Sequence, residues 1–374
     1  MKKALIISSS FLPKLNGITY ATICHIKLLK ELNFDVTLIT NVEVPLNELK
    51  KYNLENLKVI LVSIDGSGLI WNPVVGSLNG IVKVITKINP SFVFVEGWYN
   101  WGIQVVLNIR FSCKIIIFSH GSAEIRVNNF ISLIKRVGYY IYDFLNQKII
   151  YNKIDAVVFL SSFQDNNRFR DLFISKSYSK KYFILPNFNF ESVFCDTIVY
   201  TKKSTVGFNV AIVGEMSTNK NQMFLLKIIS QLNPTINFHI FYPNDNKYSL
   251  AFKSDSNYIK FKNRFNFHKG LDREQINKFT KFNIDLLLIL SITEAQPIVL
   301  IDALYQYIPF LSTDVGCVKE FSGGVTCSLN EVGKYLNKFV SESDFYDNNK
   351  AEITNYLLKS KIDKSEFSSF LDNV

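Results

Sequence analysis

Short apolar runs alternate along the chain with longer stretches that have helical periodicity. Runs of three to five residues rich in Val, Ile, Leu and Phe are typical of buried parallel strands. In the first half, strands are expected at residues 4–8, 36–40, 59–63, 92–95, 114–118, 156–160 and 182–185. In the second half they are expected at 210–213, 238–241, 259–261, 286–290 and 310–312, with helices such as 222–229 between them. The alternation predicts α/β domains built on doubly wound parallel sheets.

The chain length favours two such domains. At 374 residues, a single core would be unusually large. The polar stretch 197–205 interrupts the pattern, so the boundary is expected near residues 190–207. We therefore predict a first domain over 1–195, a second over 196–350, and C-terminal helices over 351–374 with a break near 361–364.

The segment that follows the apolar run 284–290 carries the clearest sign of chemistry. Glu294 is predicted to lie in the loop at a strand's carboxyl end, where open α/β sheets place their ligands. Pro297 suits the first position of the next helix, where no N–H is needed. Asp302 would then lie in the second turn among apolar residues, and a buried carboxylate requires a partner. The simpler alternative is an acid favoured there by the helix dipole.

Three further blocks follow expected strands, at residues 11–19 (FLPKLNGIT), 213–221 (VGEMSTNKN) and 312–320 (STDVGCVKE). Together with the Glu294 block, they resemble the retaining glycosyltransferases of family 4, in which a Glu is followed after seven residues by a second Glu. The resemblance spans residues 5–320. It implies two facing Rossmann-like domains with parallel sheets, a deep interdomain crevice, a nucleotide-sugar donor, and a last helix that crosses back to the first domain.

The same resemblance assigns eight positions to the site. They are His120 and Glu294 as catalytic residues, and Gly17, Gly214, Lys220, Ala295, Gln296 and Asp302 as donor-binding residues. It implies that Glu294 contacts the donor sugar, that Asp302 contacts the ribose, and that Lys220 contacts the phosphates. His120 would lie near the sugar and the leaving phosphate, where an imidazole can donate a hydrogen bond.

Simpler interpretations remain open at these positions, and two residues depart from the family pattern. Lys220 can be a surface lysine at a helix start, His120 an ordinary polar contact, and Gly17 a lone loop glycine. Glu215 stands where many members carry Arg, beside the expected diphosphate. Asp302 replaces the second Glu, which shortens its reach by roughly 1.5 Å, more than a hydrogen bond tolerates.

Several classes of cofactor and partner find no support in the sequence. No Asp-x-Asp cluster is placed for Mg²⁺, so neither a metal nor a cofactor is expected. No Gly-x-Gly-x-x-Gly follows a strand, which argues against a nicotinamide dehydrogenase. The five cysteines have no Cys-x-x-Cys spacing, which favours a reduced cytosolic setting without zinc. No segment resembles a nucleic-acid module.

The positive charge is concentrated in the first half. Residues 1–195 hold 22 Lys or Arg against 13 Asp or Glu, a net of +9, and residues 196–374 have a net of +1. Within the basic half, the segment 128–145 surrounds Lys135 and Arg136 with aliphatic and aromatic residues. This pattern fits an interfacial helix on an anionic membrane and fits equally well a helix packed on a sheet.

Together with the resemblance, which implies retention, the donor class and the acceptor class, these observations predict a cytoplasmic, metal-independent, retaining glycosyltransferase of cell-surface polysaccharide synthesis. It would use a nucleotide-sugar donor and a glycan or lipid-linked acceptor, with peripheral contact at the inner face of the membrane. The alternatives are a binding or scaffold subunit of the same fold that has lost catalysis, favoured by the two departures, and a sugar-nucleotide epimerase. The donor base, the sugar, the acceptor and the linkage are not encoded in any motif of fixed spelling.

Overall fold

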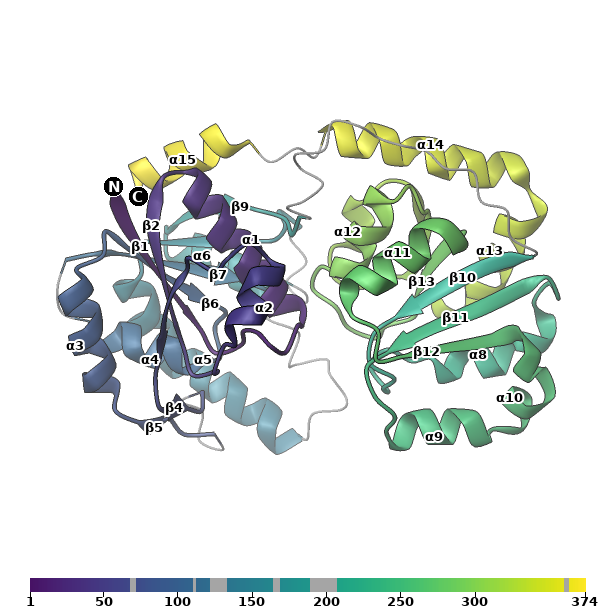
Figure 1. Ribbon diagram of the computed structural model, residues 1–374, viewed down its shortest axis with the longest axis horizontal. Coiled ribbons are helices and arrows are strands. Elements are labelled where there is room, and N and C mark those ends of the chain that lie inside the picture. Colours follow the sequence, from purple (N-terminus) through teal and green to yellow (C-terminus); the bar gives the residue numbers. More distant parts are fainter. Residues whose placement is uncertain (68–71, 110–111, 122–132, 164–168, 189–206, 360–362) are drawn as a thin grey trace. The chain divides into compact units, whose positions relative to one another are not determined.

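The computed structural model describes residues 1–67, 72–109, 112–121, 133–163, 169–188, 207–359 and 363–374. Its contacts divide the chain into two compact units (Figure 1). The first comprises Met1–Phe190 with Ile362–Val374, and the second comprises Glu191–Lys361. The expected boundary at 195/196 falls in a segment outside the described residues. The crevice between the domains stays a prediction.

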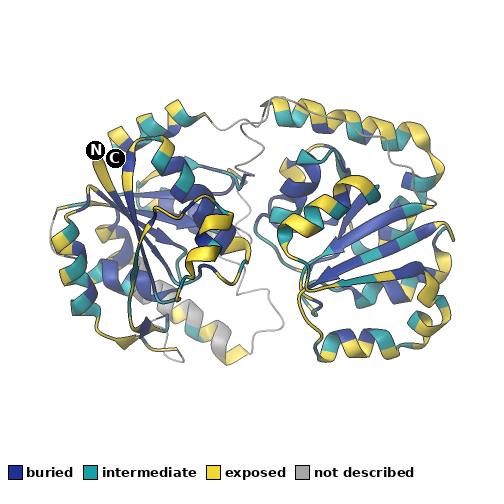
Figure 2. Cartoon of the chain, viewed as in Figure 1, coloured by how far each residue is buried: buried dark blue, intermediate teal, exposed yellow. Residues whose placement is uncertain are grey.

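The first unit is built on a seven-stranded parallel sheet in the order β3-β2-β1-β6-β7-β8-β9. Its strands are β1 (Lys2–Ser8), β2 (Phe34–Thr40), β3 (Lys58–Leu61), β6 (Phe92–Glu96), β7 (Lys114–Ser119), β8 (Ala156–Phe159) and β9 (Lys181–Ile184). The central strands are almost entirely buried (Figure 2), which explains their unbroken apolar sequences. A small antiparallel pair, β4 (Ile64–Asp65) and β5 (Val75–Gly76), lies outside this sheet.

Helices flank the first sheet. They are α1 (Gly17–Glu31), α2 (Leu46–Lys51), α3 (Leu78–Ile88), α4 (Trp101–Asn108), α5 (Leu133–Lys153) and α6 (Arg170–Ser177). Helix α1 contacts β1 and β2, α4 contacts β6, and α6 contacts β9. The last helix, α15 (Lys364–Asn373), also packs on this unit: Asp372 pairs with Lys2 at 2.7 Å, and Phe367 stacks near Phe183.

The second unit contains a six-stranded parallel sheet in the order β12-β11-β10-β13-β14-β15. Its strands are β10 (Phe208–Val213), β11 (Ile236–Tyr242), β12 (Phe265–Lys269), β13 (Leu286–Ile289), β14 (Phe310–Thr313) and β15 (Gly324–Cys327). Its core combines inward residues of these strands with residues of the surrounding helices. It includes Val210, Ile212, Leu225, Phe238, Phe252, Leu286, Leu311 and Leu336.

The helices of the second unit complete its layers. They are α8 (Met223–Ile228), α9 (Lys247–Ser254), α10 (Ser256–Phe261), α11 (Arg273–Asn283), α12 (Ile298–Tyr305), α13 (Val332–Ser341) and α14 (Ser343–Lys359). Four 3-10 turns accompany them: η1 (Ile229–Gln231), η2 (Lys262–Arg264), η3 (Val318–Glu320) and η4 (Leu329–Glu331). The predicted fold class, two α/β domains with parallel sheets, is thereby confirmed.

Three details of the expected elements are wrong. Residues 259–261 form the end of helix α10, because Asp255 caps this helix by accepting from the Asn257 N–H, and Ile259 is exposed. The strand expected there is β12, which begins four residues later. Helix α12 begins at Ile298, so Pro297 is its cap with an extended backbone rather than its first residue. The helix expected over 222–229 ends at Ile228.

The segment 128–145, expected to be an interfacial or packed helix, is described only in part. Residues 128–132 lie outside the described residues, and so do the side chains of Lys135 and Arg136. Helix α5 exposes Leu133, Ile134, Val137 and Ile141. Within the described residues, no helix has both the length and the apolar character needed to cross a membrane.

Candidate functional site

The strongest candidate site lies at the carboxyl ends of β10 and β13. These adjacent strands mark the point where the strand order of the second sheet reverses, with Val210 opposite Leu286. Ligands of open α/β sheets bind at such a switch point. Asn219 joins the two loops that follow the strands: its amide donates to the Thr293 carbonyl at 3.1 Å and accepts from the Thr293 N–H at 3.2 Å. The loops therefore form one local structure.

Three predicted site residues meet in these loops. The Lys220 ammonium forms a close ion pair with the Glu294 carboxylate, although 74 residues separate them in sequence. Gly214 lies against the lysine stem, where an added Cβ would be 3.2 Å from Lys220 Cε, and its φ of +139° disfavours any side chain. Lys220 is 27% exposed and Glu294 16%, so both are accessible to a ligand.

The loop at Ala295 and Gln296 is fixed by its neighbour after β14. The Cys317 N–H donates to the Ala295 carbonyl at 3.0 Å. Gly316 has a φ of +52°, and a Cβ there would lie 1.9 Å from that carbonyl oxygen, so only glycine fits. Gln296 is buried. The 312–320 block thus supports the loop that carries Glu294.

Asp302 has the partner that its burial requires. Arg273, the first residue of α11, holds it in a bidentate ion pair, with Nε 2.8 Å from one carboxylate oxygen and a terminal nitrogen close to the other. The Asp302 side chain is 8% exposed. Sequence analysis missed Arg273, because the 29 residues between the partners leave no local spacing to detect. The expectation that a buried carboxylate here requires a partner is confirmed, and the helix-dipole alternative for Asp302 stays open.

Glu215, the other departure, lies on the exposed side of its loop. Its carbonyl accepts from the buried Gln222 amide at 3.1 Å, and the same Gln222 accepts from the Ser217 N–H. The backbone of Glu215 therefore helps to shape the loop after β10.

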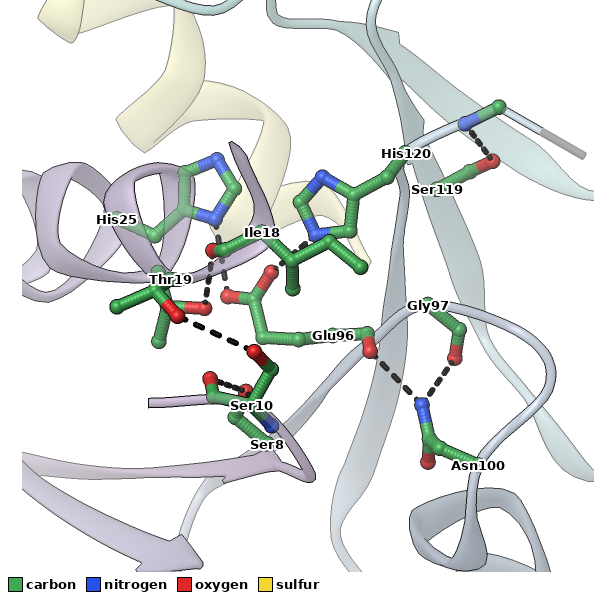
Figure 3. A network of polar contacts seen from close by, with 12 residues as sticks. Ser8, Ser10, Ile18, Thr19, His25, Glu96, Gly97, Asn100, Ser119 and His120 are labelled. Atoms are coloured by element: carbon green, nitrogen blue, oxygen red, sulfur yellow. Dashed lines mark hydrogen bonds and ion pairs between the residues drawn. The ribbon is translucent and has the colours of Figure 1, made fainter. Parts of the chain in front are cut away.

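The first unit gathers its candidate residues at the same edge of its own sheet (Figure 3). Glu96 ends β6, His120 follows β7, and His25 lies on α1. The Glu96 carboxylate lies between the two rings, 2.7 Å from His120 Nε2 and 2.9 Å from His25 Nδ1. Sequence analysis identified His120 and missed both partners. An acid that closes the apolar run 92–95, and a histidine within an apolar helix, were the available signals.

The charges and hydrogen bonds of this cluster keep the buried Glu96 carboxyl group ionised. Burial alone would raise the pKa of Glu96, but the charge on His25 and hydrogen bonds from His120 and His25 lower it to about 2. Asp171, which lies nearby, behaves oppositely: burial raises its pKa despite hydrogen bonds from Ser119 and Trp98. Glu96 therefore carries a full negative charge at neutral pH.

Gly17 begins α1 in the loop after β1. Asn16 caps the helix by accepting from the Thr19 N–H at 2.9 Å, and its amide donates to Ser10 Oγ at 2.8 Å. Ser10 Oγ also lies 3.1 Å from Thr19 Oγ1 (Figure 3). Gly17 is exposed, so its backbone is open to a ligand, and nothing in this unit alone assigns a ligand to it.

Among the described residues, no three His, Cys, Asp or Glu side chains cluster as a metal site.

Comparison with known proteins agrees with the geometry of the second unit. Residues 202–323 match the family model of glycosyl transferases group 1. This region includes Gly214, Lys220, Glu294 and Asp302. Among curated proteins, none matches the chain significantly.

Several solved structures have a similar fold. HepE from Anabaena, in complex with UDP and glucose, has a TM-score of 0.71 at 12% identity and covers 100% of this chain and 99% of its own. TarM from S. aureus, in complex with Fondaparinux, alpha-GlcNAc-glycerol and UDP, has a TM-score of 0.71 at 12% identity, with 100% and 99% covered. Sucrose-phosphate synthase from Thermosynechococcus elongatus has a TM-score of 0.67 at 12% identity, with 95% of each chain covered. At these identities the likeness shows a shared fold.

Proposed function

We propose that this chain, whose residues 202–323 carry a glycosyl transferases group 1 domain, is a retaining, metal-independent glycosyltransferase. It moves a hexose from a nucleotide-sugar donor to a glycan or lipid-linked acceptor in cell-surface polysaccharide synthesis. The observation that carries the proposal is the meeting of Gly214, Lys220 and Glu294 at the switch point of the second sheet. The domain match supports glycosyl transfer, and the positions of these three residues support a donor site at this switch point.

The Lys220–Glu294 pair fits a donor with a charged and an uncharged part. A nucleotide sugar brings a diphosphate, which attracts the Lys220 ammonium, and sugar hydroxyls, which donate to the Glu294 carboxylate. Lys220 can then bind the diphosphate and Glu294 the sugar hydroxyls while the two side chains stay next to each other. As the glycosidic bond breaks, negative charge grows on the diphosphate, and the fixed ammonium stabilises it.

The bound ligands of the similar structures favour a uridine nucleotide. HepE was solved with UDP-glucose, and TarM with UDP. We therefore propose a UDP-sugar as the donor and UDP-glucose as the first compound to test. Asp302 is the candidate contact of the ribose, held in place by Arg273.

The proposed location is the inner face of a membrane. The net charge of +9 over residues 1–195 and the exposed Leu133, Ile134, Val137 and Ile141 on α5 support it. Anionic vesicles should bind the protein at low salt. Replacing Lys135 and Arg136 with Glu should weaken co-sedimentation, because each charge contributes on the order of 1 kcal/mol. Equal binding by the reversed variant would assign this helix to packing within the unit.

Ligand binding tests the proposed function directly. UDP and UDP-glucose should raise Tm, because a ligand at 100 times its Kd stabilises by about 2.7 kcal/mol. GDP-, ADP- and CMP-sugars complete the panel. Lys220→Ala should weaken UDP binding roughly tenfold, the value of one charge-assisted hydrogen bond. Lys227→Ala, an exposed lysine on α8, is the matched control. A protein that binds donors without turning them over would be a binding subunit, and one that binds none would refute the proposal.

A further inference from the structure

The buried carboxylate of Glu96 links two imidazole rings that come from different elements of the first unit. Its side chain is 0% exposed, with His25 on one oxygen and His120 on the other (Figure 3). We propose that Glu96, oriented by His25, is a positioning residue that fixes the neutral ring of His120 in the tautomer protonated on Nε2. The remaining nitrogen, Nδ1, then accepts a hydrogen bond from a substrate hydroxyl. The inference rests on the proposed function and deepens it.

The tautomer follows from the charge on the carboxylate. Surrounding hydrogen bonds and charge keep Glu96 ionised, and an ionised carboxylate can only accept. The two ring nitrogens that face it, Nδ1 of His25 and Nε2 of His120, must therefore both carry hydrogen. A neutral imidazole has one N–H, so Nδ1 of His120 retains its lone pair.

Both the side chain and the backbone of Glu96 are held in place by neighbouring residues. His25 stacks on Phe118 with ring centroids 3.8 Å apart and planes at 15°, so its ring cannot turn away from Glu96. The Asn100 amide donates to the Glu96 and Gly97 carbonyls at 2.8 and 3.0 Å, which holds the end of β6. Asn100 in turn caps α4 by accepting from the Gly102 N–H. Contacts to the side chain and to the backbone of Glu96 therefore both oppose small movements of this residue.

The free nitrogen selects the kind of group that His120 can bind. The ring is 12% exposed, and Nδ1 has no hydrogen-bond partner among the described residues. In the inferred tautomer Nδ1 is an acceptor, so it suits a sugar or acceptor hydroxyl. A phosphate oxygen, which is also an acceptor, would be repelled. The inference thus replaces the expected hydrogen bond from His120 to the leaving phosphate with one received from a hydroxyl.

The tautomer can be measured without any donor. Long-range ¹⁵N–¹H correlation on the full-length protein at neutral pH should show a protonated Nε2 and an unprotonated Nδ1 for His120. In Glu96→Gln the amide has one acceptor oxygen and one NH2 group, so it cannot accept from both rings, and the His120 signals should shift or become mixed. A His120 ring with Nδ1–H in the wild type, or signals unchanged in Glu96→Gln, would overturn the inference.

Kinetics separate positioning from general stability. With UDP-glucose as donor, Glu96→Gln should lower kcat about tenfold, the value of one lost hydrogen bond to a charged group, while UDP affinity stays as in the wild type. His25→Asn keeps an amide donor near Glu96 and should retain more activity than His25→Leu. Thr37→Val, a near-isosteric change at a buried position of β2, should leave kcat unchanged and controls for stability.

The two hypotheses fail in different ways. A wild-type protein that shows the inferred tautomer but neither binds nor turns over any sugar nucleotide would refute the proposed function alone. A wild-type protein that turns over UDP-glucose, with Glu96→Gln folded and equally active, would refute the positioning role alone. If Glu96→Gln does not fold, two measurements still test the positioning role: the tautomer of His120 in the wild type, and whether His25→Asn is more active than His25→Leu.

Discussion

The two units neutralise their site carboxylates in opposite ways. In the first, the Glu96 carboxylate lies between the imidazole rings of His25 and His120. In the second, Glu294 pairs with the Lys220 ammonium, and Asp302 pairs with the Arg273 guanidinium. The first unit therefore shares one carboxylate between two rings, whereas the second gives each carboxylate a cationic partner of its own.

Accessibility follows the same division. The Glu96 carboxylate is fully buried and contacts the rings of both His25 and His120, so we expect it to act through these imidazoles. The Lys220–Glu294 pair is partly open to solvent, so a ligand can compete for either partner. We therefore expect substitution of Glu96 to change the protonation of the neighbouring imidazole. Substitution of Lys220 or Glu294 should change ligand affinity or turnover.

The largest expected effect comes from leaving Asp302 without its partner. Arg273→Met should lower the free energy of unfolding by about 3 kcal/mol, the lower end for a broken buried ion pair, because Arg273 is still 19% exposed. Urea unfolding measures the loss. Lys278→Met, an exposed change on the same helix, is the control. If Arg273→Met matches this control, the pair contributes nothing to stability.

Acid should reveal the contrast between the units. The pKa of Glu96 is lowered from 4.5 to about 2 in the folded protein, so its stabilisation is complete above pH 4.5 and is lost as pH falls towards 2. The full loss is about 3 kcal/mol, reached only at the lowest pH. Unfolding curves of the wild type and Glu96→Gln, measured from pH 6 to pH 3, should converge as pH falls. Parallel curves would mean that Glu96 titrates alike in both states.

A smaller effect is expected where the ligand can replace a lost contact. Glu294→Gln should reduce sugar transfer at least tenfold, because the charged hydrogen bond to the sugar is worth about 1.5 to 3 kcal/mol. UDP affinity should change little, since the diphosphate contacts remain. Initial rates with UDP-glucose and calorimetry with UDP measure the two quantities. Unchanged transfer kinetics would remove Glu294 from the site.

The sequence predicted most of the fold because parallel strands buried on both faces leave continuous apolar runs. It failed where that relation breaks. Residues 259–261 (Ile, Lys and Phe) belong to helix α10, where Ile259 is exposed, and the edge strand β12 has a single fully buried residue, Phe265. The strand β15 begins with a glycine and is only partly buried, so its sequence has no strong apolar run.

Site residues could be predicted where they lie within a short sequence block. Partners that come from distant elements of the fold could not. Lys220 and Glu294 were expected from the blocks that carry them, and their ion pair joins those blocks. Arg273, His25 and Glu96 were missed, because each acts through a contact that only the folded sheet creates. Roles shared between the units, such as those of Gly17 and His120 at a donor, stay predictions.

The smallest effect is expected from chelation, and it tests whether fixed side-chain charge suffices in the second unit. In the proposed reaction the Lys220 ammonium balances the leaving diphosphate, and no step is assigned to a metal. Transfer from UDP-glucose should therefore continue at the same rate in EDTA as in added Mg²⁺.

The variant Lys220→Ala tests directly whether the lysine supplies this charge. If Mg²⁺ restores activity to Lys220→Ala but does nothing to the wild type, the lysine supplies the charge that a metal provides elsewhere. Loss of wild-type activity in EDTA with recovery in Mg²⁺ or Mn²⁺ would show instead that the ammonium alone does not balance the diphosphate.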